Sequence, residues 1–350
     1  MNIGVFLPNW VGDTVMAVPT VRALREHFGS RANLVGVLRP YLLPVLDGLP
    51  WFNERLCYDR GRCAPEHRMI RVVEEMRRRR FDKVVLLTNS LSTAVLAWMS
   101  GAAERIGYDR YARGCLLTHR LSPPRTGNDF TPISAVDYYL QLAETMGCRQ
   151  TLRQLELATT AVEEAEADRV WEKLGIPATR QVITFNTGGA YGVAKHWPSD
   201  SFVALARRIV STWDVTVLVI CGPSDRHTAA EIMKQADHLR VTSLANERLS
   251  LGLTKACVRR SALMVSTDSG PRHFAAAFNI PTVTMFGPTD PRWSVNYNSR
   301  EVILRLDLAC SPCAKRICPL GHHDCMRRLA VQDVFGAVAE LLPDGNRRAA

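Results

Sequence analysis

One lysine and two carboxylates, each placed just after an expected strand, are the residues of this sequence best suited to chemistry. Asp13 follows the first apolar run and enters a helix. A carboxylate held there can take a proton from a hydroxyl, or it can cap the helix. Lys195 and Asp268 follow two later apolar runs. A lysine in such a loop can neutralise phosphate charge, and a carboxylate can bind sugar hydroxyls.

A glycine-rich loop leads up to the lysine. Residues 187–195 read TGGAYGVAK, and Gly188, Gly189 and Gly192 would let backbone amides approach phosphate oxygens. The loop is not a Walker A loop, because Ala194 stands where that pattern needs glycine. A strand-to-helix turn can need glycine without any ligand, so it is the combination of strand, glycines and lysine that indicates a phosphate site.

A second candidate loop, STDSGP, begins at residue 266. Pro271 fits the first turn of the helix that follows, and the amides of Ser269 and Gly270 would point at an anion over the helix N-terminus. Asp268 would repel a phosphate there, so sugar hydroxyls are its natural partner unless it caps the helix. His273, one turn further on, is either a core histidine or a ligand contact.

The elements that must position these loops are strands alternating with helices, which is typical of an α/β fold with a parallel sheet covered on both faces. Two Rossmann-like halves in tandem, with a cleft between them, are the simplest such architecture, and ligands then bind at the carboxyl ends of the strands. In the helix after Gly12, Pro19 should cause a bend or confine the regular part to the residues after it. Apolar runs predict strands at 3–7, 34–38, 83–88, 181–186, 215–221, 262–266 and 282–286. Helical spacing predicts helices at about 66–80, 93–99, 136–146, 160–174, 201–213 and 272–278.

The length of 350 residues favours two domains. We expect an N-terminal Rossmann-like domain at 1–160 and a linker region at 161–180. A C-terminal Rossmann-like domain at 181–330, with a cysteine-rich segment at 310–325, should follow, and then a C-terminal helix and tail at 331–350.

Composition and charge narrow the class of protein. With 47% hydrophobic and 22% charged residues, the chain is not collagen-like, of low complexity or disordered. The start has no basic region followed by a long apolar one, and the most apolar stretch, 84–103, is interrupted by polar residues. We therefore expect neither a signal peptide nor a membrane span. The formal net charge of +10 favours anionic partners such as phosphates, nucleic acid or a membrane face.

Two rival functions are disfavoured. A Rossmann oxidoreductase would carry G-x-G-x-x-G after the first strand, where only Gly12 stands. A basic nucleic-acid-binding module would interleave aromatic residues with its basic stripe. The aromatic residues, 7% of the chain, show no such clustering. We therefore expect no nucleic-acid partner.

Four of the ten cysteines, Cys310, Cys313, Cys318 and Cys325, crowd into one short segment. Thiols that include a C-x2-C pair can hold a structural zinc ion tetrahedrally. In a reducing cytosol they can equally remain free in a small knot, and disulfides could form on isolation. All three alternatives stay open.

Together the loops resemble the ADP-heptose:lipopolysaccharide heptosyltransferases, glycosyltransferase family 9, and among them most the heptosyltransferases II. The resemblance spans nearly the whole chain. It implies the GT-B fold, in which two Rossmann-like doubly wound domains face a central cleft. The segments that carry it are PNWVGDTVMAVPTVRALR from Pro8, GGAYGVAKHWP from Gly188 and STDSGPRHFAAAFNIPTVTMFGPTDP from Ser266.

The resemblance implies an inverting glycosyltransferase that needs neither a catalytic metal nor another cofactor. Asp13 matches the base that deprotonates the acceptor hydroxyl, and Lys195 matches the residue that steadies the leaving diphosphate. We expect Gly12 and two loop arginines, Arg60 and Arg62, to contact the acceptor. Donor contacts are expected at Thr187, Gly188, Gly189, Lys195, Ser224, Asp225, Leu244, Thr267, Asp268, Ser269, Gly270 and His273.

The implied donor is ADP-heptose, and the implied acceptor is a Kdo-lipid A-type lipopolysaccharide core. That acceptor is anionic and membrane-tethered, so we expect a cytoplasmic protein in peripheral contact with the cytoplasmic face of the inner membrane. The chain also departs from the family pattern. Many members have proline at the position of Thr187 and arginine or lysine at that of His196, and heptosyltransferases II often have lysine at that of Ser92. These departures leave the expected donor site in place and bear on the identity of the acceptor. Another family 9 transferase, with a different nucleotide sugar or acceptor, is the alternative.

Overall fold

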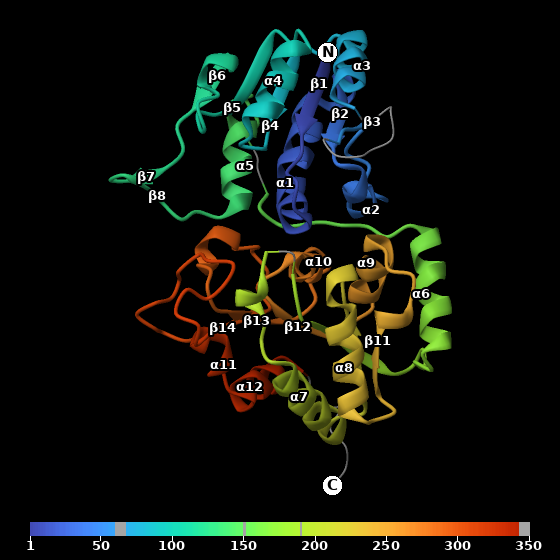
Figure 1. Ribbon diagram of the computed structural model, residues 1–350. Helices are drawn as coiled ribbons and strands as arrows, with labels where there is room; N and C mark the ends of the chain where they lie inside the picture. The colour runs from blue at the N-terminus through green and yellow to red at the C-terminus, as the bar shows by residue number, and fades with distance from the viewer. Residues whose placement is uncertain (60–67, 150–151, 190, 343–350) are drawn as a thin grey trace. The chain divides into compact units, whose positions relative to one another are not determined.

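The computed structural model describes residues 1–59, 68–149, 152–189 and 191–342. The chain divides into two compact units (Figure 1), one of Met1–Ala158 with Arg292–Asn296 and the other of Thr159–Pro291 with the chain from Tyr297 onward. Each unit is built on one six-stranded parallel sheet. No helix in the described part of the chain is both long and apolar enough to cross a membrane.

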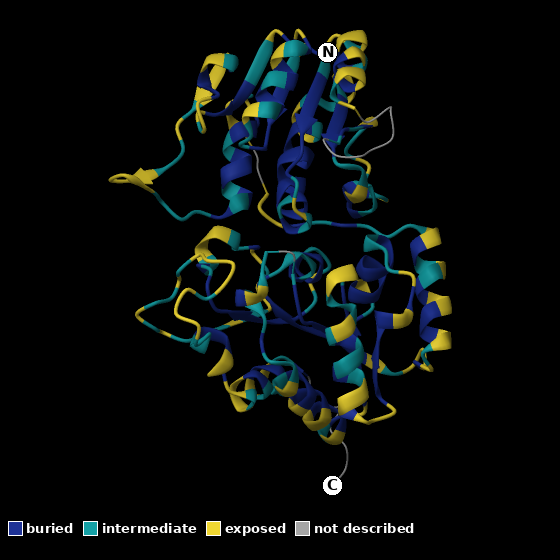
Figure 2. Cartoon of the chain, in the orientation of Figure 1, coloured by how far each residue is buried: buried dark blue, intermediate teal, exposed yellow. Residues whose placement is uncertain are grey.

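The sheet of the first unit has the strand order β3-β2-β1-β4-β5-β6. The first strand lies in the middle, where Val5 is paired with Gly36 on one side and Val85 on the other. A central parallel strand is covered on both faces, and the middle of the sheet is correspondingly buried (Figure 2). The strands are β1 (Asn2–Phe6), β2 (Asn33–Leu38), β3 (Glu54–Cys57), β4 (Lys83–Leu86), β5 (Glu104–Tyr108) and β6 (His119–Leu121).

Helices cover this sheet through their apolar residues. The helix α1 (Val11–Phe28) packs against α5 (Ala135–Glu144). The helices α3 (Met69–Arg79) and α4 (Leu91–Met99) contribute to an apolar cluster with residues of β1, β2 and β4. The expectation that Pro19 confines the first helix to later residues is wrong, because α1 begins at Val11 and continues through Pro19. The burial of this helix segment offsets the cost of the proline.

The sheet of the second unit has the order β11-β10-β9-β12-β13-β14, which repeats the order of the first. The strand ladder again has a central strand, since Phe185 is paired with Val219 on one side and Val265 on the other. The strands are β9 (Gln181–Asn186), β10 (Val215–Ile220), β11 (Val241–Ser243), β12 (Leu263–Thr267), β13 (Thr282–Phe286) and β14 (Glu301–Arg305).

The helices of the second unit are α6 (Ala161–Lys173), α7 (Ser199–Thr212), α8 (Arg226–Ala236), α9 (Leu251–Arg259), α10 (Gly270–Ala277), α11 (Asp324–Arg327) and α12 (Val331–Leu341). The region 161–180, expected as a linker, contains α6 and belongs to this unit. It is joined to α9 by a buried ion pair, in which Lys255 Nζ lies 3.0 Å from Glu163 Oε1.

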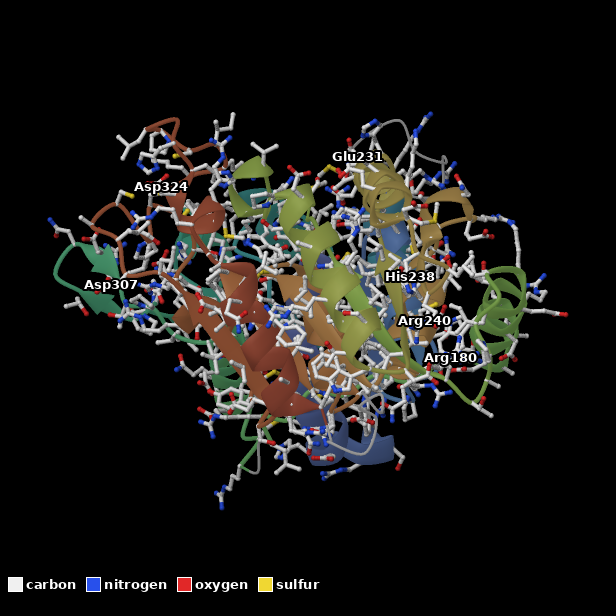
Figure 3. The ribbon with its side chains drawn as sticks, turned by 90° about the horizontal axis from the view of Figure 1, so that it is seen from below. Arg180, Glu231, His238, Arg240, Asp307 and Asp324 are labelled. Atoms are coloured by element: carbon white, nitrogen blue, oxygen red, sulfur yellow. The ribbon has the colours of Figure 1, made fainter. Side chains whose placement is uncertain are left out.

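The amino ends of the strands in the second sheet carry charged residues that pair with one another. At the amino ends of the strands, Arg180 and Arg240, both labelled in Figure 3, contact Asp214, with nitrogen–oxygen distances of 3.8 and 2.8 Å. These charges join the starts of neighbouring strands. In both sheets the strand order reverses beside the central strand, at β1/β4 and at β9/β12. Ligands of doubly wound sheets bind at the carboxyl ends of the strands at such a point.

Candidate functional site

In the first unit, Asp13 lies in the first turn of α1, just beyond the carboxyl end of β1. The N-cap of the helix is Trp10, which makes no side-chain cap bond. The positive end of the helix dipole stabilises a carboxylate in this turn. Gly12, the expected acceptor contact, precedes Asp13 in the same turn and is buried. Arg60 and Arg62 lie outside the described residues.

A buried tyrosine from another helix holds the Asp13 carboxylate. Tyr139 lies on α5, and its hydroxyl donates a hydrogen bond of 3.1 Å to Asp13 Oδ1. Burial, and then the neighbouring negative charge of Asp13, raise the pKa of Tyr139 well above its ordinary value. The phenol is therefore a neutral donor that fixes one oxygen of the carboxylate.

In the second unit, Lys195 and Asp268 form a buried ion pair. Lys195 Nζ lies 2.5 Å from Asp268 Oδ2 and donates to the backbone oxygen of Asp268 at 3.0 Å. Their side chains are only 11% and 9% exposed. The lysine also lies 4.4 Å from the ring centroid of Tyr191. The glycine-rich loop thus carries a cation to the carboxyl ends of β9 and β12.

Asp268 is held ionised by more than the lysine. Its carboxylate also accepts from Thr289 Oγ1 at 2.7 Å and from Arg272 Nη1 at 3.3 Å. Burial alone would raise the pKa of Asp268, but the charges of Lys195 and Arg272 and the hydrogen bonds lower it to about 2. The N-cap of α10 is Ser269, so Asp268 serves as a counter-ion at this edge and not as the helix cap.

Three buried polar atoms near this pair have no hydrogen-bond partner within the described residues. They are Thr187 Oγ1, Thr267 Oγ1 and His273 Nδ1. Burial and the nearby Arg272 charge lower the pKa of His273 well below its ordinary value, so its imidazole is neutral. Buried polar groups are normally paired. These three atoms lie after β9, at the end of β12 and in α10, at the same edge of the sheet as the Lys195–Asp268 pair.

The loops around these atoms approach one another closely. A Cβ on Gly189 would lie 2.8 Å from Ser269 Cβ, and a Cβ on Gly188 would lie 2.6 Å from Asp225 Oδ1. Asn186, the last residue of β9, donates to Ser266 Oγ at 2.9 Å and also to Ser269 Oγ. The glycine-rich loop, the start of α10 and Asp225 are therefore gathered at one edge of the sheet.

The remaining expected donor contacts lie on either side of this group. Ser224 is in the turn that ends at Asp225 before α8. Gly270 begins α10, so its amide belongs to the first turn of that helix. Leu244 follows β11, and its side chain is fully buried in the core.

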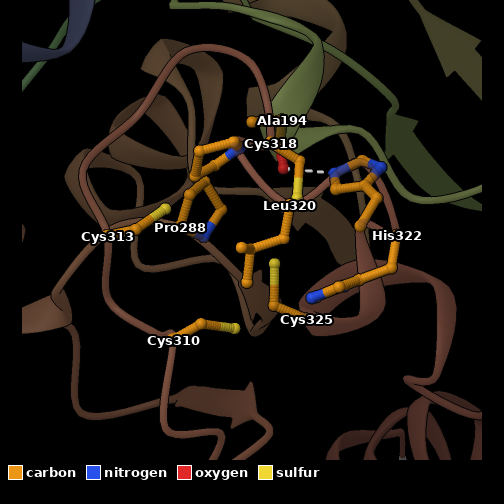
Figure 4. A pocket seen from close by; sticks show the side chains of 10 residues that line it. Ala194, Pro288, Cys310, Cys313, Cys318, Leu320, His322 and Cys325 are labelled. Carbon is orange, nitrogen blue, oxygen red and sulfur yellow. Dashed lines mark hydrogen bonds between the residues drawn. The ribbon is translucent and has the colours of Figure 1, made fainter.

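The four clustered cysteines line one small pocket together with His322 and His323 (Figure 4). All four are free thiols in this structure. In the part of the chain that the structure describes, no group of three or more His, Cys, Asp or Glu side chains could hold a metal ion. Backbone amides, first that of His323, lower the pKa of Cys318, whereas burial and the neighbouring thiols raise that of Cys325.

Sequence reasoning misses Tyr139, Asn186 and Thr289. Asn186 ends a strand that is buried from Val182 onward, and a polar residue at the end of a buried strand is a signal that could have found it. Thr289 lies inside the GPTDP stretch without marking a strand end. Tyr139 is one of several apolar-face residues of its helix, and nothing in the sequence connects it with Asp13.

Comparison with known proteins gives one family match and several relatives. The model of glycosyltransferase family 9 (heptosyltransferase) matches residues 69–323. Lipopolysaccharide heptosyltransferase 2 of Escherichia coli K12 is 25% identical over 98% of this chain and 99% of its own. The structure of E. coli ADP-heptose lipopolysaccharide heptosyltransferase II has a TM-score of 0.79 at 23% identity, covering 97% of this chain and 98% of that one.

A third relative is an E. coli heptosyltransferase in a structure with ADP-2-deoxy-2-fluoro heptose. It has a TM-score of 0.71 at 16% identity and covers 98% of this chain and 100% of that chain. These likenesses confirm the predicted fold class, an α/β chain with the two Rossmann-like domains of GT-B proteins.

Proposed function

The chain belongs to glycosyltransferase family 9, and we propose that it transfers L-glycero-D-manno-heptose from ADP-heptose to the Kdo- and heptose-containing inner core of lipopolysaccharide. The observation that carries the proposal is the buried Lys195–Asp268 pair beside Thr187, Thr267 and His273, whose polar atoms lack partners in the described structure. The name of the E. coli relative, lipopolysaccharide heptosyltransferase 2, supports the choice of reaction.

The donor would bind at the carboxyl edge of the second sheet. There Lys195, the amides of Gly188 and Gly189, and the α10 amides of Ser269 and Gly270 would bind the diphosphate. The side chains of Thr187, Thr267, Asp268 and His273 would face phosphate and heptose. Ser224 and Asp225 would lie near the ribose, and Leu244 near the adenine. The region 181–330 would thus be the nucleotide-sugar domain.

The acceptor would bind in the region 1–160, with Gly12, Arg60 and Arg62 among its contacts. Its hydroxyl oxygen attacks the anomeric carbon from the side opposite the diphosphate, and the bond from that carbon to the diphosphate oxygen breaks. Asp13 takes the hydroxyl proton, and ADP leaves with the electron pair. This displacement inverts the anomeric configuration. General-base help of this kind contributes roughly 10²–10⁴-fold in rate.

We propose that transfer needs no metal ion or other cofactor. A pre-placed cation such as Lys195 would stabilise the negative charge that grows on the leaving diphosphate. A single pre-placed hydrogen-bonding group of this kind lowers the barrier by about 3–4 kcal/mol. A chelator should therefore leave the rate unchanged. A rate that falls with chelator and recovers with Mg²⁺ would contradict this.

Metal analysis of protein made without a His-tag tests the structural zinc considered for the four cysteines.

We also propose that the protein works at the cytoplasmic face of the inner membrane, in peripheral contact. The net charge of +10 and an anionic, membrane-tethered acceptor support this. Co-sedimentation with vesicles of anionic lipid should be strong at low salt and weak at high salt, because screening weakens exposed charge pairs. Vesicle binding that is independent of both salt concentration and lipid charge would exclude electrostatic, peripheral contact with the membrane.

The experiment that tests the function is a panel of nucleotide sugars. A ligand that binds only the native state raises the melting temperature. ADP-heptose should stabilise the protein most, and the protein should then transfer heptose to a Kdo-lipid A acceptor. The alternative is another family 9 transferase that uses a different nucleotide sugar or acceptor. Stabilisation by a UDP or GDP sugar, with none by ADP-heptose, would establish that alternative and overturn the proposal.

A further inference from the structure

The cysteine-rich segment 310–325 packs directly on the loop that carries Lys195. Ala194, the residue before the lysine, has both backbone polar groups bound by this segment. Its amide donates to the backbone oxygen of Arg316 at 3.1 Å, and its carbonyl lies 2.5 Å from His323 Nε2, the contact dashed in Figure 4. A carbonyl oxygen only accepts, so His323 Nε2 carries the proton and donates.

Two further contacts join the same partners. The hydroxyl of Tyr191 donates to the backbone oxygen of Ala314 at 2.7 Å. The Tyr191 ring lies 4.4 Å from Lys195 Nζ and 5.5 Å from the guanidinium carbon of Arg316. The aromatic ring before the lysine is therefore held by the segment and in turn contacts the lysine.

Only a glycine fits at position 192, where the loop and the segment approach each other closely. Its φ is 151°, a conformation that residues with a side chain rarely adopt, and a Cβ would lie 2.6 Å from the backbone oxygen of Arg316. The loop is thus shaped against the segment over Tyr191, Gly192 and Ala194, immediately before Lys195. This gives the third glycine of the loop a role that is separate from phosphate binding.

The segment is itself fixed to the end of β13. Ser311 Oγ donates to the backbone oxygen of Gly287 at 2.6 Å, and the amide of Ala314 donates to that of Pro288 at 2.7 Å. The next residue, Thr289, donates to the Asp268 carboxylate. One short stretch, 287–289, therefore anchors both the counter-ion of Lys195 and the segment that shapes its loop.

We propose that the cysteine-rich segment is the support that fixes the lysine loop in its donor-binding shape, and that His323 is its positioning residue. The inference rests on the proposed function, because it takes Lys195 as the group that meets the donor diphosphate. His323 does not touch the donor. It acts through Ala194, by holding the carbonyl that precedes the lysine.

The test compares two adjacent histidines. In His323→Ala the hydrogen bond to Ala194 is lost, and ADP should bind roughly three- to tenfold more weakly by titration calorimetry, which is the usual worth of one such bond. His322 is the matched control: its Nδ1 accepts from the amide of Asp324 at 2.9 Å, within the segment itself. His322→Ala should keep the ADP affinity of the unmodified protein. His323→Gln, whose amide can donate from a similar position, should restore most of the affinity.

A double-mutant cycle separates positioning from general damage. If His323 acts through the lysine, His323→Ala should weaken ADP binding far less in a Lys195→Ala background than in the unmodified one. Equal losses in the His322 and His323 variants, or full additivity with Lys195→Ala, would overturn the support role. Failure of the unmodified protein to bind ADP would instead overturn the proposed function on which the inference rests.

Discussion

Asp13 lies in the first turn of α1 and holds a hydrogen bond from Tyr139, so its carboxylate is oriented before any substrate arrives. We predict that Asp13→Asn keeps ADP binding and lowers turnover by about 10²–10⁴-fold, the usual share of a general base. Asparagine has the same shape and can still accept from Tyr139, so the turn itself should persist. Turnover and calorimetric ADP affinity measure the two effects, and normal turnover in this variant would end the role of Asp13.

The neutral phenol of Tyr139 should affect the protonation of the Asp13 carboxylate, because its hydroxyl donates a hydrogen bond to it. The phenol stabilises the ionised form of Asp13, so Tyr139→Phe should shift the acid limb of the kcat–pH profile to higher pH. The neighbouring Tyr138 is a matched control, because its hydroxyl donates to Asn89 at 3.2 Å. Tyr138→Phe should leave the acid limb in place. Identical profiles for both variants would show that the hydrogen bond to Asp13 does not tune the reaction.

At the scale of elements, the cysteine-rich segment carries thiols in unlike surroundings. Backbone amides lower the pKa of Cys318, whereas burial and neighbouring thiols raise that of Cys325. We predict that, among the four thiols of this segment, iodoacetamide alkylates Cys318 first and Cys325 last, because the thiolate is the reactive form. Peptide mass spectrometry over time measures the order. Protection of all four thiols that a chelator abolishes would contradict free thiols and point to a bound metal.

Central elements are predictable from the sequence and edge elements are not. The strands β9 (Gln181–Asn186) and β13 (Thr282–Phe286) match their predictions, and β1 and β12 are each shifted by one residue from theirs. These strands are buried on both faces and read as continuous apolar runs. The edge strand β6 (His119–Leu121) has polar, exposed residues, and β14 (Glu301–Arg305) is only partly buried, so neither stands out from loops.

The candidate site is predictable only in part for a similar reason. Lys195 and Asp268 each follow a strand, and this placement marks them in the sequence. Their ion pair spans 73 residues of chain, and the Tyr139–Asp13 hydrogen bond spans 126. Such partners are set by strand order and helix packing, which periodicity does not specify. The support of Ala194 by His323 belongs to the same class.

At the scale of the whole molecule, buried charges make stability depend on pH. In the second unit, Lys195, Asp268, Arg272 and Glu301 form a chain of ion pairs, with Arg272 Nε 3.1 Å from Glu301 Oε1. A separate cluster joins α6 to the end of α9, where Glu164 pairs with Arg259 and Arg260. Burial alone would raise the pKa of Glu164, but these arginines lower it to about 2.

Both carboxylates should therefore make the fold sensitive to acid. The pKa of Asp268 is about 2 in the folded protein against an ordinary 3.8, so the unfolded chain takes up its proton first as the pH falls. Its contribution is complete above about pH 4 and is lost toward pH 2, by roughly 2 kcal/mol. Urea unfolding at pH 5, 4 and 3 should show the decline. In Glu164→Gln the free energy of unfolding should depend less steeply on pH, because the contribution of the Glu164 carboxylate is already absent. An unchanged slope would show that the pairs of Glu164 with Arg259 and Arg260 do not control acid stability.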